Sequence, residues 1–347
     1  MMNSAPHNQN PWLSRFIWFL ASLTLFLICS GGLVTSKGVG LAVPDWPTTF
    51  GYNMFAFPYS EWVGGVFFEH SHRLIASGVG FLTIILAVWL WMADSRKWMR
   101  VLGLVALVAV IVQGVLGGLR VTMLKDELGI FHACLAHAFL CLLVFIGIAR
   151  SRVWLSAARH NPGAILWLPV LTTFIIFAQL ALGATMRHQH RDLAILDFPA
   201  AYGRVIPDVS SESLAGINRW RDANALSEVN AGHIWLQMAH RLVAVVISAG
   251  VIWYAVALRR RARPFRLLLT LSSLWVFFLA IQVTLGAWTI WTNKAADVAT
   301  AHVAVGATML ALGVSIWAIA ARTQARRAAS AMVPRAAAPV AAGAHGV

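Results

Sequence analysis

The sequence is poor in charged residues: Asp, Glu, Lys and Arg make up only 12% of its 347 residues, whereas a soluble domain usually has about 25%. It also has only three cysteines, Cys29, Cys134 and Cys141. Each lies inside an apolar segment, so the sequence predicts neither a disulfide framework nor a zinc site. Acidic residues are scarcer than basic ones, 13 against 27. Because the basic residues form short runs between apolar segments, we expect no nucleic-acid partner.

Apolar residues are abundant instead, at 59% of the chain. They form eight segments of about 20 residues, the length that the hydrocarbon core of a bilayer requires. We therefore predict an all-α integral membrane protein with eight transmembrane helices, at 15–35, 67–92, 100–119, 129–149, 164–185, 234–257, 266–291 and 297–321.

The charged connections predict the orientation. The segments after the second, fourth and sixth helices and the tail after residue 321 are rich in arginine, and only Asp94 of the acidic residues lies among them. By the positive-inside rule these segments face the cytoplasm, together with both termini, 1–14 and 323–347. Two long loops, about 36–66 and 186–233, then lie outside, and the second is long enough to predict a functional or partly folded segment. The tail from Ser330 is Ala- and Pro-rich and is expected to be disordered.

Several motifs occur twice in the same order. Residues 40–51 resemble residues 192–203, and residues 113–118 resemble residues 282–287. Each half has four spans, an even number, so both halves enter the membrane from the same side. We predict two pseudo-symmetric four-helix bundles, formed by residues 15–150 and 164–322 and joined by a cytoplasmic linker at 151–163.

Four histidines follow the same repeat. His72 and His132 of the first half recur as His240 and His302 of the second, each near the outer start of a predicted helix. Two imidazoles on facing helices can supply both axial ligands of a haem iron, and the core of a four-helix bundle is a common place for such a cofactor. A single histidine at a helix start is more often a packing or interfacial residue, but recurrence as pairs favours ligands. Zinc fits less well, because two histidines per half leave too few ligands.

Charged residues accompany the histidines. Arg73 and Arg241 each follow a candidate ligand directly, and either pair with a haem propionate or extend to the lipid headgroups. Glu69 lies one helical turn before His72 and shares a face with it, whereas the matching position of the second half is Gln237. This asymmetry predicts proton-coupled chemistry in the first half and a held cofactor in the second. The alternative is that Glu69 simply lies at the membrane interface.

Other histidines lack this pattern. His70 and His137 have no counterparts in the second half, and we interpret them as interfacial or packing residues. His188 and His190 lie in or beside the second outer loop, and their role stays open.

The motifs together resemble the haem A synthase family. The resemblance covers roughly residues 15 to 320 and rests on residues 31–47, the Glu69-His-Ser-His72-Arg73 motif, residues 117–122, residues 125–132, Arg187-His188 and residues 197–199, in that order. Two departures are the absence of the outer-loop cysteine pair of some bacterial members and the presence of His137 where glutamine is expected. His137 therefore remains a candidate ligand beside His132.

The resemblance implies an enzyme of the bacterial cell (inner) membrane that oxidises the C8 methyl of haem O to a formyl group and supplies haem A to cytochrome oxidase. It implies haem B on His240 and His302, and the substrate haem near His72 and His132, with Glu69 required for activity. Candidate partners are the haem O synthase, an electron donor and a second copy of the chain.

Two other functions compete with this one. A dihaem b-type electron carrier, such as a quinol-oxidising subunit, would use the same histidine pairs, but it has no evident need for one asymmetric carboxylate at Glu69. A transporter with a parallel repeat would place shared polar residues near the membrane midplane, whereas these histidines lie near one rim.

Overall fold

The computed structural model describes residues 10–152, 154, 165–189, 191, 193–261 and 265–331, with side chains up to residue 323. Eight helices of this part of the chain are long and apolar enough to span a membrane, which confirms the predicted class. They are α1 (Pro11–Ser36), α2 (Gly64–Ala93), α3 (Lys97–Met123), α4 (Asp126–Arg150), α6 (Trp167–His188), α8 (Ala231–Arg259), α9 (Arg266–Trp291) and α10 (Ala296–Ala331). The described residues form no β-strand.

The ends of these helices follow local sequence signals. Asn10 caps α1, accepting a hydrogen bond from the backbone of Trp12, and Asn230 with His233 forms a capping box at the start of α8; both satisfy amides that have no partner within the helix. Helix α10 continues to Ala331, so the first residues of the expected disordered tail, 323–347, are helical. Residues 332–347 of that tail and most of the expected linker 151–163 lie outside the described residues.

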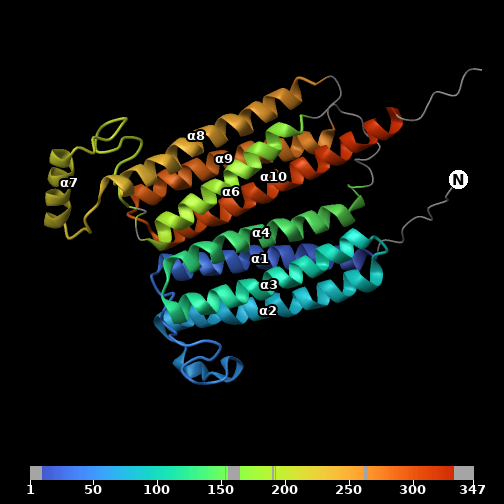
Figure 1. The fold of residues 1–347 in the computed structure, drawn as a ribbon, viewed down its shortest axis with the longest axis horizontal. Helices are drawn as coiled ribbons and strands as arrows, with labels where there is room; N and C mark the ends of the chain where they lie inside the picture. The colour runs from blue at the N-terminus through green and yellow to red at the C-terminus, as the bar shows by residue number, and fades with distance from the viewer. Residues whose placement is uncertain are drawn as a thin grey trace, which may run out of the picture.

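The eight helices pack as two rings of four. In the first ring α1 contacts α2 and α4, and α3 contacts the same two helices; in the second ring α6 contacts α8 and α10, and α9 contacts the same two helices. The rings meet where α1 and α4 pack against α10, and α4 against α6 (Figure 1). This arrangement is consistent with the two predicted pseudo-symmetric bundles.

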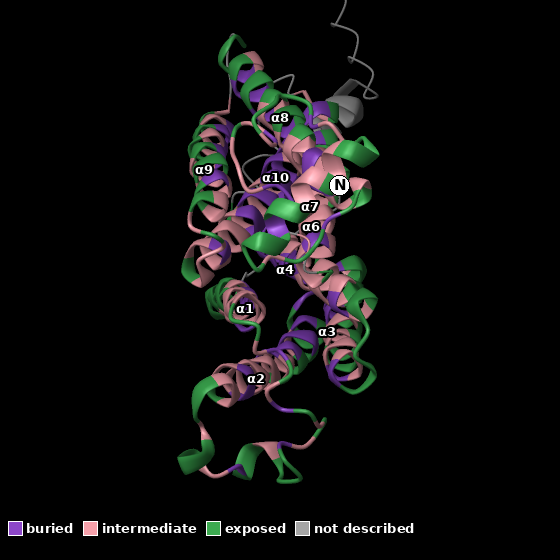
Figure 2. Cartoon of the chain, turned by 90° about the vertical axis from the view of Figure 1, so that its left-hand side faces the viewer, coloured by how far each residue is buried: buried purple, intermediate pink, exposed green. Residues whose placement is uncertain are grey.

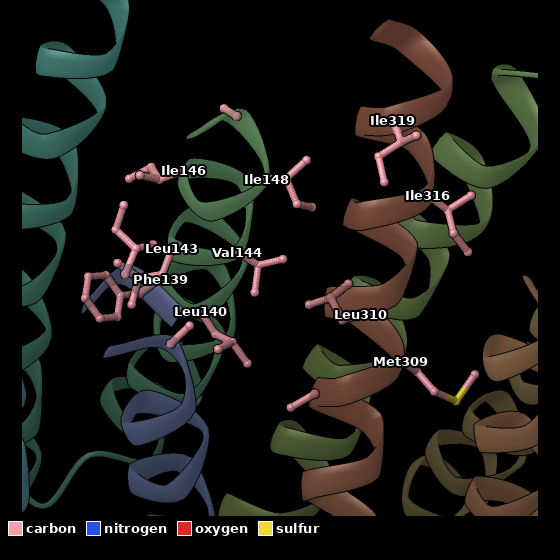
Figure 3. Packing of buried hydrophobic residues seen from close by; sticks show 14 of the residues in the cluster. Phe139, Leu140, Leu143, Val144, Ile146, Ile148, Met309, Leu310, Ile316 and Ile319 are labelled. Carbon is pink, nitrogen blue, oxygen red and sulfur yellow. The ribbon is translucent and has the colours of Figure 1, made fainter. Parts of the chain in front are cut away.

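The core lies between the two rings. More than half of the apolar window of α10 is buried, 56% against 17% for α3, so α10 is central and α3 peripheral. Figure 3 shows Val144 and Ile148 of α4 pointing toward α10, and Leu310 of α10 pointing back toward α4. Viewed from the end that carries the long loops, exposed residues cover the outward faces of the helices (Figure 2). Such apolar outward faces suit contact with lipid.

Both long loops lie at the same end of the helices (Figure 1). The first contains two 3₁₀ turns, Met54–Ala56 and Tyr59–Glu61, and the second contains α7 (Ser211–Ala223). A small hydrophobic cluster anchors the second loop to the start of α8, formed by Ala194, Ile195, Ala201, Val229, Ile234 and Met238. The prediction that the second loop is partly folded is therefore confirmed.

The opposite end carries a buried ion-pair cluster. Asp94, in the α2–α3 connection, pairs with Arg96 and with Arg150 at the end of α4, and Arg100 donates to the backbone carbonyl of Asp94 (2.7 Å). Burial alone would raise the pKa of the Asp94 carboxyl, but hydrogen bonds from Arg96 and the charges of Arg96 and Arg150 outweigh burial and lower that pKa to about 2. The cluster ties α2, α3 and α4 together at this end.

Candidate functional site

Each of the four recurring histidines packs against a glycine of a neighbouring helix. A Cβ at these glycines would lie 2.9–3.4 Å from the Cε1 atom of the histidine, in the pairs Gly31–His72, Gly117–His132, Gly183–His240 and Gly286–His302. The first residue of each pair lies on α1, α3, α6 or α9 and the second on α2, α4, α8 or α10. Because glycine has no Cβ, the ring can approach the neighbouring backbone closely.

A glutamine four residues before the glycine supports three of these histidines. Gln113 donates to the backbone carbonyl of His132 (2.9 Å) and Gln179 donates to that of His240 (2.8 Å). The amide of Gln282 lies 3.4 Å from Nε2 of His302. Helix α1 has Leu27 at the matching position. The repeat is thus visible as a Gln-x-x-x-Gly pattern on three of the four helices that face a histidine.

The spacing of the second-half pair is compatible with two ligands of one metal ion. The ring centroids of His240 and His302 are 6.5 Å apart. Two imidazoles that bind one metal from opposite sides, each at a metal–nitrogen distance of about 2 Å, have centroids about 6 Å apart. The donor set therefore fits a haem iron, whose other four ligands come from the porphyrin.

The first-half pair lies in a comparable setting. His72 and His132 are within range of electrostatic interaction. Nδ1 of His132 donates to the carbonyl oxygen of Gln113 (3.1 Å), an arrangement typical of histidines that bind a metal through the other ring nitrogen. Nδ1 of His72, His240 and His302 is buried and has no hydrogen-bond partner in the described structure. A buried ring nitrogen without a partner is costly, which favours ligands over packing residues.

The outer loops form two matching turns above the histidines. The carboxylate of Asp45 accepts hydrogen bonds from the amides of Phe50 and Gly51 (2.8 and 2.9 Å). In the same way Asp197 accepts from Tyr202 and Gly203, both at 2.8 Å. Each turn has a cis proline, Trp46-Pro47 and Phe198-Pro199, and each has two successive residues with positive φ. The duplicated sequence thus forms the same backbone structure twice.

Arg73 and Arg241 hold these turns. Arg73 donates to the carbonyl oxygens of Val43 (2.7 Å), Asp45 (2.7 Å) and Thr48 (3.2 Å). Arg241 donates to those of Asp197 (2.7 Å) and Ala200 (2.8 Å). Their guanidinium groups therefore anchor the loops to α2 and α8, a role that the sequence analysis missed. The contact of either arginine with a haem propionate stays a prediction.

Glu69 and Gln237 hold the same turns from below. Glu69 is 4% exposed; it accepts the amide of Val43 (2.9 Å) and forms an ion pair with Arg73 (2.7 Å). Gln237 is also 4% exposed and accepts the amide of Ile195 (2.7 Å). Glu69 is thus buried in a hydrogen-bonded site rather than lying free at the interface.

The remaining histidines differ from the four paired ones. His70 is completely buried and contacts the rings of Phe57 and Trp62, with Nδ1 3.2 Å from the Thr49 hydroxyl. Its Nε2 also has no partner among the described residues, so recurrence in the second half, and not an unpaired nitrogen alone, distinguishes the four paired histidines from it. His137 is 6% exposed and its Nδ1 donates to the Ala133 carbonyl of its own helix (2.7 Å). Its Nε2 has no partner among the described residues, so its role as a second ligand stays open.

His188 lies at the end of α6, against Gly129 of α4, where the two rings meet. His190 lies outside the described residues.

Sequence reasoning also missed Arg120. This arginine lies in the last turn of α3 and interacts electrostatically with both first-half histidines and with Glu69. Arg120 lies in the motif at residues 117–122, but the sequence alone assigned it no role.

Comparison with known proteins assigns the chain to a family. A family model described as COX15-CtaA, cytochrome oxidase assembly protein, matches residues 14–314. The chain belongs to the COX15-CtaA family. The match covers all four paired histidines and both loop turns.

Curated relatives of this COX15-CtaA protein are named as haem A synthases. That of Geobacillus kaustophilus is 26% identical over 305 residues, 82% of this chain and 85% of the relative. That of Shouchella clausii is 26% identical over 277 residues (78% and 84%), and that of Alkalihalophilus pseudofirmus 25% over 289 residues (80% and 87%). Most of the length of each relative is therefore represented here.

Proposed function

We propose that this COX15-CtaA protein is a haem A synthase, an oxidoreductase that converts the C8 methyl of haem O to a formyl group by successive hydroxylations. The observation that carries the proposal is that in both rings two histidines each pack against a glycine of a neighbouring helix. In the second ring His240 and His302 have the spacing expected of two axial ligands. The family match and the names of the relatives support it.

His240 and His302 would hold a resident haem B in the second ring. Such a haem supplies one-electron redox chemistry to the enzyme. The chain's own contribution is to position both histidines: Gly183 and Gly286 let the rings approach the neighbouring helices. Gln179 donates to the backbone carbonyl of His240, and the amide of Gln282 lies beside the ring of His302. This rigid frame keeps the ligands at one spacing.

His72 and His132 would bind the substrate haem in the first ring, with Glu69 beside them. Each step of the oxidation moves protons as well as electrons, and α2 contains no acidic residue other than Glu69. Glu69 is one turn from His72 and is held in place by Val43 and Arg73. We assign it to accepting or passing those protons. Its counterpart Gln237 cannot ionise, which fits a ring that only holds a cofactor.

Eight apolar helices make this a multi-pass membrane protein. We propose that it lies in the bacterial cell membrane with both termini in the cytoplasm, since the arginine-rich connections share one end. The histidine pairs then lie near the outer surface. Haem O would arrive from its synthase, and an electron donor is the other candidate partner.

Pigment analysis tests this function. The protein is produced with a haem O synthase in cells that lack their own haem A synthase, purified, and its extracted haems are separated by chromatography. We expect haem B together with haem O or haem A. Haem B alone at two per chain would instead indicate a b-type electron carrier, and the absence of haem would contradict both functions.

Variants assign the resident site. His240→Ala and His302→Ala are expected to insert into the membrane but to lose the haem B spectrum, whereas His233→Gln at the cap of α8 retains it. Retention of the wild-type spectrum by both alanine variants would place the resident haem elsewhere.

A further inference from the structure

Arg120 is a cation without a partner. No hydrogen bond or ion pair of its guanidinium is found among the described residues, although it lies half-buried at the outer end of α3. It packs against the backbone of Gly40, where a Cβ would lie 2.9 Å from a guanidinium nitrogen. The other two arginines of the site differ, because Arg73 and Arg241 donate hydrogen bonds to backbone carbonyl oxygens of the loops.

The surroundings of Arg120 do not neutralise it. Glu69 is within electrostatic range, but its two oxygens already accept from Val43 and Arg73. Asp126, also within range, is exposed at the start of α4 and forms no ion pair with Arg120. A charged group near the hydrocarbon region is costly unless it is paired. The unpaired guanidinium therefore indicates an anionic ligand.

Arg120 lies one helical turn after Gly117, which packs against His132, so the two positions share a face of α3. The guanidinium also interacts electrostatically with His72 and His132. An anion bound there would belong to whatever these histidines hold. A carboxylate matches a guanidinium best, because the two form parallel charge-assisted hydrogen bonds.

We propose that Arg120 binds a propionate carboxylate of the substrate haem and so selects a porphyrin with free propionates in the first ring. This inference rests on the proposed function. The second ring has Thr289 at the corresponding position of α9, and its nearby Arg187 donates to the Gly32 carbonyl and the Ser36 hydroxyl of α1. Among the described residues, α9 therefore has no arginine that corresponds to Arg120, and a site that must bind and release its ligand suits an arginine without other hydrogen bonds.

The experiment compares haem O with haem O dimethyl ester, in which both propionates are neutral. Binding to purified protein that contains its resident haem is followed by absorbance titration, and conversion is measured separately. A charge-assisted hydrogen bond is worth enough to change binding about tenfold or more. The wild type is expected to bind the free acid at least that much more tightly than the ester.

Arg120→Gln is expected to bind both compounds with the affinity that the wild type shows for the ester. Arg120→Lys keeps the charge and should retain part of the preference, and Gly40→Ala should reduce it by displacing the guanidinium. Arg204→Gln, an exposed outer-loop arginine, is the matched control and keeps the full preference.

Two results are decisive. If Arg120→Gln retains the wild-type preference for the free acid, Arg120 only extends to the lipid headgroups and the inference is wrong. If the wild type binds haem O but never converts it, the proposed function fails, while the binding preference still tests Arg120.

Discussion

The glycine behind each histidine allows a graded test of the site. Replacing glycine by alanine adds one methyl group at four equivalent positions, but the space differs. The added Cβ would lie 2.9 Å from Cε1 of His72 or His132 at Gly31 and Gly117, 3.1 Å from His302 at Gly286, and 3.4 Å from His240 at Gly183. Carbon atoms in contact prefer about 3.5–4.0 Å. Alanine is therefore accommodated at Gly183, tight at Gly286, and displaces the ring at Gly31 and Gly117.

The expected size of the effect follows from these distances. Relief of the overlap at Gly31 or Gly117 moves the ring by about half an ångström or more, and a misplacement of about 1 Å can cost about 100-fold in rate. We expect Gly31→Ala and Gly117→Ala to slow conversion of haem O by about tenfold or more. The higher helix propensity of alanine, about 0.5–1 kcal/mol over glycine, offsets part of the cost of the overlap, and retention of the resident haem spectrum checks that the variants fold.

The assay measures two quantities in each variant: the spectrum of the resident haem and the rate of haem A formation. Gly31→Ala and Gly117→Ala should keep the resident spectrum and lose rate. Gly286→Ala should shift the resident spectrum, and Gly183→Ala should match the wild type in both. If Gly183→Ala were as damaging as Gly117→Ala, or if Gly117→Ala were silent, ring placement by these glycines would be refuted.

Three further predictions concern Glu69, the inner cluster and the orientation. Glu69→Gln should retain the resident haem and lose conversion of haem O; a wild-type rate would refute its role. Asp94→Asn should lower stability by about 3–5 kcal/mol, because it leaves Arg150 buried without its charged partner; an unchanged melting temperature in detergent would contradict this. Since the pKa of Asp94 falls from 3.8 to about 2 on folding, this stabilisation is present above pH 4 and lost as pH falls toward 2. Cysteine at Ser211 should react with an impermeant thiol reagent in intact cells, and cysteine at Arg261 should not; the opposite pattern would invert the topology.

Much of the fold could be predicted because the bilayer constrains it. A span must be apolar over about 20 residues, and this single condition located all eight helices, although most extend beyond the predicted bounds. Within each half, the order of the helices along the chain then predicts that consecutive helices contact each other. Helix α7 could not be located from the sequence, because it lies in a loop and the bilayer does not constrain it. The end of α10 was also predicted too early, since this helix continues to Ala331.

The paired histidines could be predicted from their recurrence, but their supports could not. The repeat of residues 113–118 at 282–287 contains Gly117 and Gly286, but the sequence does not show that each glycine contacts a histidine of another helix. The interpretation of Arg73 and Arg241 was incomplete for a similar reason. Their partners are backbone carbonyl oxygens of the loops. Because every residue has such a carbonyl, the sequence does not indicate which ones an arginine binds, whereas the charge of an arginine by itself suggests a propionate.

The hydrogen bonds of the two loop turns also bear on the role of Glu69. Glu69 and Gln237 accept the matching amides of Val43 and Ile195, so a glutamine is sufficient to anchor such a turn. The negative charge of Glu69 is therefore not needed to hold the loop. It lies instead between Arg73, which it pairs, and Arg120, which it does not. A carboxylate at a position where an amide would support the fold is what the proposed proton transfer in the first ring requires, and for that reason Glu69→Gln separates loss of proton transfer from loss of structure.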